Sequence, residues 1–312
     1  MKVTSGSDGK VSAGLGRLLA VVFVLASAGA ASAQQELART GGPYVPTPQV
    51  VVDRMLRMAG VGPDDYVIDL GSGDGVIVLT AAQQLKARGL GVDIDPELVK
   101  LANEEAQRRG VADRVSFRVM DVFKADLSQA SVVTLYLLPG MMIDLRPKIY
   151  SELKPGTRVV SHDYHFDDWR PDDAITFDVP EKEKVNGVPR ATVYLWIVPA
   201  RIAGRWTLEV EGRKRYDVTW RQNYQAAEGA ASSAGRTIKL EEAVLRGEAV
   251  EFALQGPGGR RIYKGRVIGD EMQGTVELAH GKIARWTAKR ARIRSKTPQL
   301  SSSGAGMFST TA

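Results

Sequence analysis

Apolar and polar positions along the first 200 residues follow two different periods. Short apolar runs typical of buried strands occur at 66–70, 89–94, 114–121, 131–139, 157–162, 174–179 and 190–198. Apolar residues at helical spacing occupy 75–87, 96–110, 141–153 and part of 41–60. This alternation predicts a doubly wound α/β fold with a parallel sheet covered on both faces, and the last two strands, with no helix between them, predict an antiparallel hairpin at its edge.

The helix within 41–60 has recognisable ends. We expect Thr47 as its N-cap, Pro48 as its first helical residue and Gly60 at its end. The apolar side chains that follow at helical spacing predict that one face of this helix packs on the sheet.

The pattern changes near residue 200. Over 201–292 there are about eight short runs of period 2 broken by glycine, one of them within a Gly/Ala-rich stretch at 226–235. They predict a small antiparallel β-domain, either a barrel or a sandwich. The Ser/Gly/Thr-rich segment 293–312 is predicted to be disordered.

Composition and charge support this division. The chain has 312 residues, 44% of them apolar, which is enough to form a core. Residues 1–200 carry 22 basic and 25 acidic residues, whereas 201–312 carry 20 and 11, so the two parts have opposite net charge. The chain has no cysteine, which excludes thiol catalysis, disulfides and thiolate metal sites.

The first 33 residues resemble an export signal. Lys2, Lys10 and Arg17 precede a short apolar stretch that ends in an A-x-A pattern at Ala33. We expect a secretory signal cleaved after Ala33, which places the mature chain in the periplasm or at a membrane. The alternative is an uncleaved membrane anchor, for which the stretch is short and rich in alanine compared with a span of about 20 residues. If the segment is not a functional signal, the chain is cytoplasmic.

A glycine-rich loop follows the first predicted strand, in the sequence "VIDLGSGDG" (67–75). Its glycines are Gly71, Gly73 and Gly75, with Ser72 between the first two. The dinucleotide fingerprint requires a glycine at position 76, which is valine, and the Gly-Lys-Ser/Thr of a phosphate-binding loop is absent. The remaining interpretation is the nucleoside loop of class I methyltransferases, which use S-adenosylmethionine.

Carboxylates at successive strand ends strengthen that interpretation. Asp93, followed by Ile94, ends the second strand, where it can accept hydrogen bonds from ribose hydroxyls. Asp121 ends the third strand, where it can accept from the adenine amino group while the amide of Val122 donates to a ring nitrogen. Asp69 ends the first strand and can hold the glycine loop or the ammonium of the methionine moiety. Each aspartate alone is better explained by a solvated turn, but together, at successive strand ends, they predict a cofactor site.

Four stretches carry a resemblance to a known family: "PYVPTP" (43–48), "DLGSGDG" (69–75), "YLLPGMM" (136–142) and "WRPD" (169–172). From about 43 to 172 the chain resembles the seven-strand lysine methyltransferases that modify the ATP synthase c-subunit and the adenine nucleotide translocase, and their bacterial relatives more closely. The resemblance implies a Rossmann-like seven-stranded fold, S-adenosylmethionine as cofactor and methylation of a protein lysine. It does not extend to the β-domain.

The candidate catalytic residues lie in these stretches and beside them. Tyr136, at the end of the fourth strand, could steer an amine with its ring face, or be a buried strand-end tyrosine. Pro139 belongs to the same stretch. Tyr44 could close the pocket, or act as a hydrophobic staple on the first helix. Trp169 could wall the acceptor channel or pack its loop, and Asp163 is a candidate proton acceptor.

Histidines and carboxylates alternate in "HDYHFDD" (162–168). His162, Asp163, His165 and Asp167 are residue types that bind metals, but methyl transfer from a sulfonium needs no metal and the spacing is loose. We therefore expect no metal site and interpret the segment as a polar rim that contacts a basic substrate. Either His162 or Asp163 could accept the proton.

The β-domain places arginines near aromatic residues, as in Arg205-Trp206 and Arg285-Trp286. This is compatible with an anionic partner, a membrane surface or, less well, a nucleic acid. We prefer a solvated basic face as the explanation, and such a domain could equally dock a protein substrate. Two other functions fit the sequence: a methyltransferase acting on a small molecule or a nucleic acid, and an exported nucleoside-binding protein without turnover. The sequence does not indicate an oligomeric state.

Overall fold

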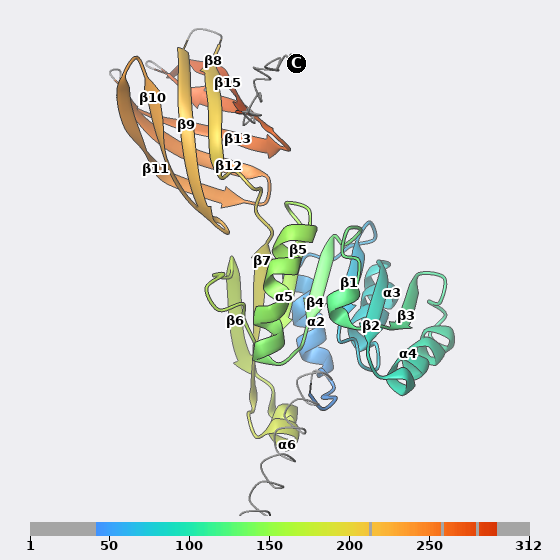
Figure 1. Cartoon of the computed structure of the whole chain (residues 1–312). Coiled ribbons are helices and arrows are strands. Elements are labelled where there is room, and N and C mark those ends of the chain that lie inside the picture. Colours follow the sequence, from blue (N-terminus) through green and yellow to red (C-terminus); the bar gives the residue numbers. More distant parts are fainter. Residues whose placement is uncertain (1–41, 212–213, 257–258, 279–280, 292–312) are drawn as a thin grey trace, which may run out of the picture. The chain divides into compact units, whose positions relative to one another are not determined.

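The computed structural model describes residues 42–211, 214–256, 259–278 and 281–291 (Figure 1). The chain divides into two compact units, whose first boundary along the sequence falls after Arg201. Unit 1 holds the residues up to Arg201 together with Gln222–Ala227 and Val244–Val250, and unit 2 holds the rest. The predicted export signal and the predicted disordered tail lie outside the described residues.

Unit 1 is built on a seven-stranded sheet in the order β3-β2-β1-β4-β5-β7-β6. Its strands are β1 (Tyr66–Leu70), β2 (Arg88–Asp93), β3 (Val115–Val119), β4 (Val132–Leu135), β5 (Arg158–His162), β6 (Asp173–Asp178) and β7 (Arg190–Ile197). The first five strands run parallel, while β7 pairs antiparallel with both β5 and β6. The predicted doubly wound fold with an antiparallel edge is therefore confirmed.

One detail of that edge differs from the prediction. A 3-10 turn, η2 (Pro180–Lys182), and a single helical turn, α6 (Glu183–Asn186), lie between β6 and β7. Pro180 begins this short helical segment and Gly187, with φ of 73°, ends it. The expectation that no helix separates the two strands is wrong by these few residues.

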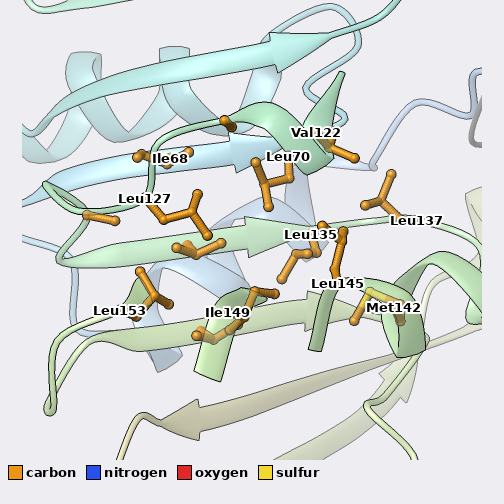
Figure 2. Close-up of a cluster of buried hydrophobic side chains, with 14 of the residues drawn as sticks. Ile68, Leu70, Val122, Leu127, Leu135, Leu137, Met142, Leu145, Ile149 and Leu153 are labelled. Atoms are coloured by element: carbon orange, nitrogen blue, oxygen red, sulfur yellow. The ribbon is translucent and has the colours of Figure 1, made fainter. Parts of the chain in front are cut away.

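Helices cover both faces of the sheet. The longer ones are α2 (Gln49–Met58), α3 (Val76–Leu85), α4 (Pro96–Arg108) and α5 (Pro139–Glu152). Adjacent strand residues point to opposite faces, so Val67 packs beneath α2 and α3 while Ile68 packs beneath α5. Figure 2 shows the hydrophobic cluster that contains Ile68, in which Leu145 and Ile149 of α5 face the strands.

Helix α2 begins one residue later than the sequence predicts. Pro48, with φ of −57° and ψ of 142°, occupies the N-cap, and no side chain caps the helix. Thr47 is therefore not the N-cap; its side chain is buried and lines a cavity instead. A difference of one residue at a helix end is common. Here it arises because Pro fits both the N-cap and the first helical position.

The strands after residue 201 form a closed antiparallel barrel in the order β10-β11-β12-β13-β14-β15-β8-β9, and most of their residues belong to unit 2. The strands of the barrel are β8 (Gly204–Val210), β9 (Lys214–Asn223), β10 (Ala226–Ser233), β11 (Arg236–Arg246), β12 (Ala249–Gly256), β13 (Gly259–Ile268), β14 (Glu271–Glu277) and β15 (Ile283–Arg290). Fully buried aromatic side chains fill the interior, among them Trp206, Phe252, Tyr263 and Trp286. Of the two predicted forms of this domain, the structure is the barrel.

Within the described ranges, no helix is both long enough and apolar enough to span a bilayer.

The close approach of β2 to β1 provides a test of the packing in unit 1. A Cβ on Gly89 would lie 2.6 Å from the carbonyl oxygen of Val67, whereas a Cβ on Gly140 in α5 would meet nothing within 4 Å. Gly89→Ala is expected to lower the free energy of unfolding by about 1–3 kcal/mol, because a backbone atom cannot move aside. Gly140→Ala, the matched control, is expected to be neutral or stabilising by up to about 1 kcal/mol. Denaturant melts of both variants make the comparison, and equal stability would contradict the close packing of these strands.

Candidate functional site

A cavity of about 520 Å³ opens at the carboxyl ends of β1 to β4. Its walls come from the glycine-rich loop after β1, the turns after β2 and β3, the segment after β4 and the stretch before α2. In an open α/β sheet this is the expected place for a ligand, because the loops diverge where the strand order reverses. Here the reversal lies between β1 and β4.

The glycine-rich loop can adopt its shape only without side chains. Gly71 and Gly73 have φ of 79° and 51°. A Cβ on Gly71 would lie 2.6 Å from the Leu137 side chain, and one on Gly73 would lie 2.5 Å from the ring of Tyr44. The loop therefore runs directly against the side chains beside it, and its backbone faces the cavity.

Asp93 ties this loop to the neighbouring strand end. One oxygen of its carboxylate accepts the N–H of Gly73 at 2.8 Å, and the other accepts the N–H of Asp95 at 3.0 Å. The amides of Gly71 and Ser72 also donate to the carbonyl of Val92, at 2.9 and 3.0 Å. Each carboxylate oxygen keeps a free lone pair for a ligand.

The charge of the lining selects the kind of ligand. Its ionisable groups other than tyrosine are five aspartates: Asp69, Asp74, Asp93, Asp95 and Asp121. No lysine, arginine or histidine is among the described residues that form the lining. Ser72 Oγ, which also lines the cavity, is buried without a hydrogen-bond partner in the described chain. A pyrophosphate would find no cationic side chain here, whereas a nucleoside that carries positive charge would find carboxylates and an available hydroxyl. The residues present therefore fit S-adenosylmethionine.

Asp69 is the buried member of this set. Its Oδ1 accepts a hydrogen bond of 2.7 Å from the hydroxyl of Thr134 in β4. Burial raises the pKa of the carboxyl to about 7, the nearby Asp93 and Asp74 carboxylates add to the rise, and the Thr134 bond opposes it. A positively charged ligand group next to Asp69 would favour its ionised form.

Tyrosines line the mouth of the cavity. Tyr136, just after β4, and Tyr164, just after β5, both line the cavity, and their rings are nearly parallel with centroids 6.3 Å apart. The ring of His162 lies behind Tyr136, with centroids 4.0 Å apart. On the other side Tyr44 hydrogen-bonds to Asp74, and burial together with that carboxylate raises the pKa of the phenol.

Most of the residues predicted from the sequence meet at this cavity. Ten of them line it: Tyr44, Asp69, Gly71, Ser72, Gly73, Asp93, Ile94, Asp121, Val122 and Tyr136. Four do not line it: Gly75, Pro139, Asp163 and Trp169. Their positions in the fold explain why.

Gly75 is the N-cap of α3 and its Cα faces the ring of Phe117, on the far side of the loop. Pro139 is the first residue of α5. Trp169 is fully buried among aromatic side chains, stacked on Tyr224 at 4.9 Å. Trp169 therefore packs its loop, which is the second of the two roles considered for it.

Asp163 is engaged away from the cavity. Its carboxylate accepts hydrogen bonds from Nζ of the buried Lys182 and from the N–H of Thr192. His162, beside it, is fully buried; burial, and then the charge of Lys182, lower the pKa of the imidazole to about 4 although Asp163 opposes this. The contact of 3.4 Å between His162 Nε2 and Asp163 is thus made by a neutral ring. No group of three or more histidine, aspartate or glutamate side chains is arranged to hold a metal ion in the described ranges.

Sequence reasoning missed several residues of the site, among them Asp95, which lies two residues after Asp93 in the turn after β2. Asp74 lies in the glycine loop itself, and Tyr164 follows β5 as Tyr136 follows β4, so the rule that ligands bind at strand ends could have found both. Thr134 is a polar residue in an apolar strand, and only the structure places its hydroxyl on Asp69.

Comparison with known proteins agrees with this geometry. Residues 69–173 match the family model described as the ANTKMT methyltransferase domain. A protein-lysine N-methyltransferase of Saccharolobus islandicus is 42% identical over 157 residues, which are 50% of this chain and 93% of that protein. The chain belongs to this methyltransferase family. It is an enzyme whose cofactor is S-adenosylmethionine.

The chain is also similar to two further proteins over the same part of its sequence. The ATP synthase c-subunit lysine N-methyltransferase of Xenopus laevis is 33% identical over 158 residues, 51% of this chain and 68% of that protein. A crystal structure titled RNA methyltransferase from Salinibacter ruber, in complex with S-adenosyl-L-homocysteine, is 51% identical and covers 51% of this chain and 96% of that one, with a TM-score of 0.46. The family model ends at residue 173, before the barrel begins.

Asp93→Asn tests the assignment of the cofactor site. Loss of the charged acceptor should weaken binding of S-adenosylmethionine by about 10- to 150-fold, because a charge-assisted hydrogen bond contributes about 1.5–3 kcal/mol. Calorimetric titration of the whole chain measures this. A thermal melt of the variant serves as the control for folding, and unchanged affinity would remove Asp93 from the site.

The raised pKa of Asp69 predicts how binding depends on pH. In the free protein the group favours folding below its unfolded value of 3.8, and this contribution is lost as the pH rises through about 7. A cation prefers the ionised form, so the affinity for S-adenosylmethionine should rise with pH up to about 7, by at most about tenfold per pH unit, and then level off. Asp69→Asn should bind more weakly and lose this slope. The same slope in both proteins would contradict the prediction.

Proposed function

We propose that this methyltransferase transfers the methyl group to the side-chain amine of lysine in a protein. The observation that carries the proposal is the 42% identity to a relative named as a protein-lysine N-methyltransferase, of which the chain covers 93%. The site supports it in three ways: its charge, its aromatic mouth and its lack of basic groups.

The acidic lining suits a basic acceptor. A lysine ammonium would be drawn toward the aspartates, while a polyanion such as RNA needs lysine or arginine on its phosphates. The described lining offers five carboxylates and none of these cations. Residues 1–200 carry a net negative charge, which favours a basic protein over a nucleic acid at this unit.

The aromatic mouth suits the chemistry. When bound, the cofactor supplies a methyl group activated by a positive sulfur. The protein has to present a neutral amine in line with that group and keep water away from its lone pair. The rings of Tyr136 and Tyr164 can attract the ammonium, and contact with these rings at the cavity excludes water from the amine and lowers its pKa.

The proton of the ammonium needs an acceptor at the cavity. His162 and Asp163, the two candidates from the sequence, do not line the cavity, and Asp163 already accepts from Lys182 and Thr192. We therefore expect the proton to pass to a lining carboxylate or to water at the mouth, with desolvation of the amine as the driving term.

Incubation of the whole chain with methyl-labelled S-adenosylmethionine and separate protein and RNA fractions tests the proposal. Label should appear in protein, survive nuclease, and map to lysine by peptide mass spectrometry. Asp93→Asn should abolish most of it. Label confined to RNA, or to residues other than lysine, would refute the assignment.

A further inference from the structure

The outer edge of the sheet at β6 is unpaired. β6 is the last strand in the sheet order, and in the described chain it pairs only with β7 (Figure 1). Its register with β7 is regular from Asp173 to Asp178. Exposed strand edges are normally protected by lysine, proline or a bulge. β6, with the sequence DAITFD, has none of these. The N–H of Ala174 donates to the Asp173 carboxylate at 2.8 Å, and the remaining outward backbone groups of β6 can accept another strand.

One face of this edge also lacks a helix. The chain between β5 and β6 contains no helix, and on that face Ala174, Thr176 and Thr192 lie at the surface or nearly so. The hydroxyls of Thr176 and Thr192 hydrogen-bond at 2.9 Å across the strand pair. The other face is anchored, because Ile175 and Phe177 pack on the core. A firmly held strand with small outer side chains leaves room for a neighbour.

Charge indicates which segment could pair there. Residues 163–183 carry eight acidic and two basic side chains, and one of the two, Lys182, is buried against Asp163. Asp173 and Asp178, at the two ends of β6, are exposed, and the Asp178 carboxylate also lies 3.6 Å from Nε of the exposed Arg190 on β7, so Asp173 is the carboxylate of β6 without a cation beside it in the described chain. The opposite edge strand, β3, carries an arginine and no acidic residue. The β6 edge therefore attracts a basic segment and repels an acidic one.

The β6 edge also lies within a few residues' reach of the cavity. His162, Val193 and Ile175 lie in one row across β5, β7 and β6, and Tyr164, two residues past His162, lines the cavity. A strand added to β6 would lie three strand spacings from β5, about 14 Å. About four residues of extended chain cover that distance.

We propose that the β6 edge binds a basic, extended segment of the protein substrate as an additional strand, with the target lysine about four residues beyond it. This docking surface rests on the proposed function, since it presents a lysine to the same cavity. Main-chain hydrogen bonds hold the segment, and Asp173 and Asp178 select its charge.

Peptide substrates test the docking surface on the whole chain. The first peptide alternates arginine with threonine or valine over the length of β6 (6 residues), followed by a spacer of about four residues and one lysine. A second replaces the arginines by glutamate, and a third keeps them but places proline in the strand segment. The first should be methylated with a kcat/KM about tenfold above either of the others, through KM.

A charge-reversed enzyme provides the matching test. Asp173→Lys combined with Asp178→Lys should lower kcat/KM for the first peptide about tenfold, leave kcat unchanged and favour the glutamate peptide. Glu104→Lys combined with Asp113→Lys, two exposed acidic residues at the other end of the sheet, makes the same charge change and should have no effect.

The outcomes separate the two proposals. Equal methylation of the first and the proline peptides overturns strand addition, and equal methylation of all three peptides also overturns charge selection, while lysine methylation stands. No methylation of any peptide by an enzyme that labels protein lysine likewise overturns the docking surface. Label found only in RNA refutes the proposed function itself.

Discussion

The carboxylate of Asp93 connects the parts on which the cavity depends. It accepts one amide from the glycine-rich loop after β1 and one from the turn after β2, so the two loops are fixed relative to each other. The glycines of this loop have positive φ, and the amides of Gly71 and Ser72 also donate to the carbonyl of Val92. Asp93 therefore helps to fix the floor of the cavity and also faces the ligand.

The electrostatics of the site follow from the same crowding of carboxylates. The carboxylates of Asp93 and Asp74 add to the cost of ionising the buried Asp69, whose pKa is raised to about 7, chiefly by its burial. A cationic ligand relieves this repulsion. The electrostatic free energy of the site is thus higher without a bound cation than with one. This property is typical of binding sites and is not expected of a structural core.

Much of this was predictable because the signals are local. Buried apolar runs followed by glycine or aspartate located the strand ends, and the strand-end rule then brought Asp69, Asp93 and Asp121 to one cavity. Two kinds of feature could not be predicted from the sequence. Alternation of period 2 is the same in a barrel and a sandwich, so closure of the barrel required the strand pairing. Side-chain partners such as Thr134 on Asp69, or Lys182 on Asp163, join residues far apart in sequence and leave no periodic trace.

Unit 1 is not a continuous stretch of sequence. Residues 222–227 and 244–250 belong to it, and Tyr224 stacks on Trp169 and meets Tyr150 edge-on at 5.1 Å. Gln222 donates to the carbonyl of Ala200 at 2.8 Å. A protein shortened to end at residue 201 would thus lose the aromatic cover of its own catalytic unit. The catalytic unit accordingly includes residues from three separate stretches of the chain, and no single cut in the sequence would isolate it.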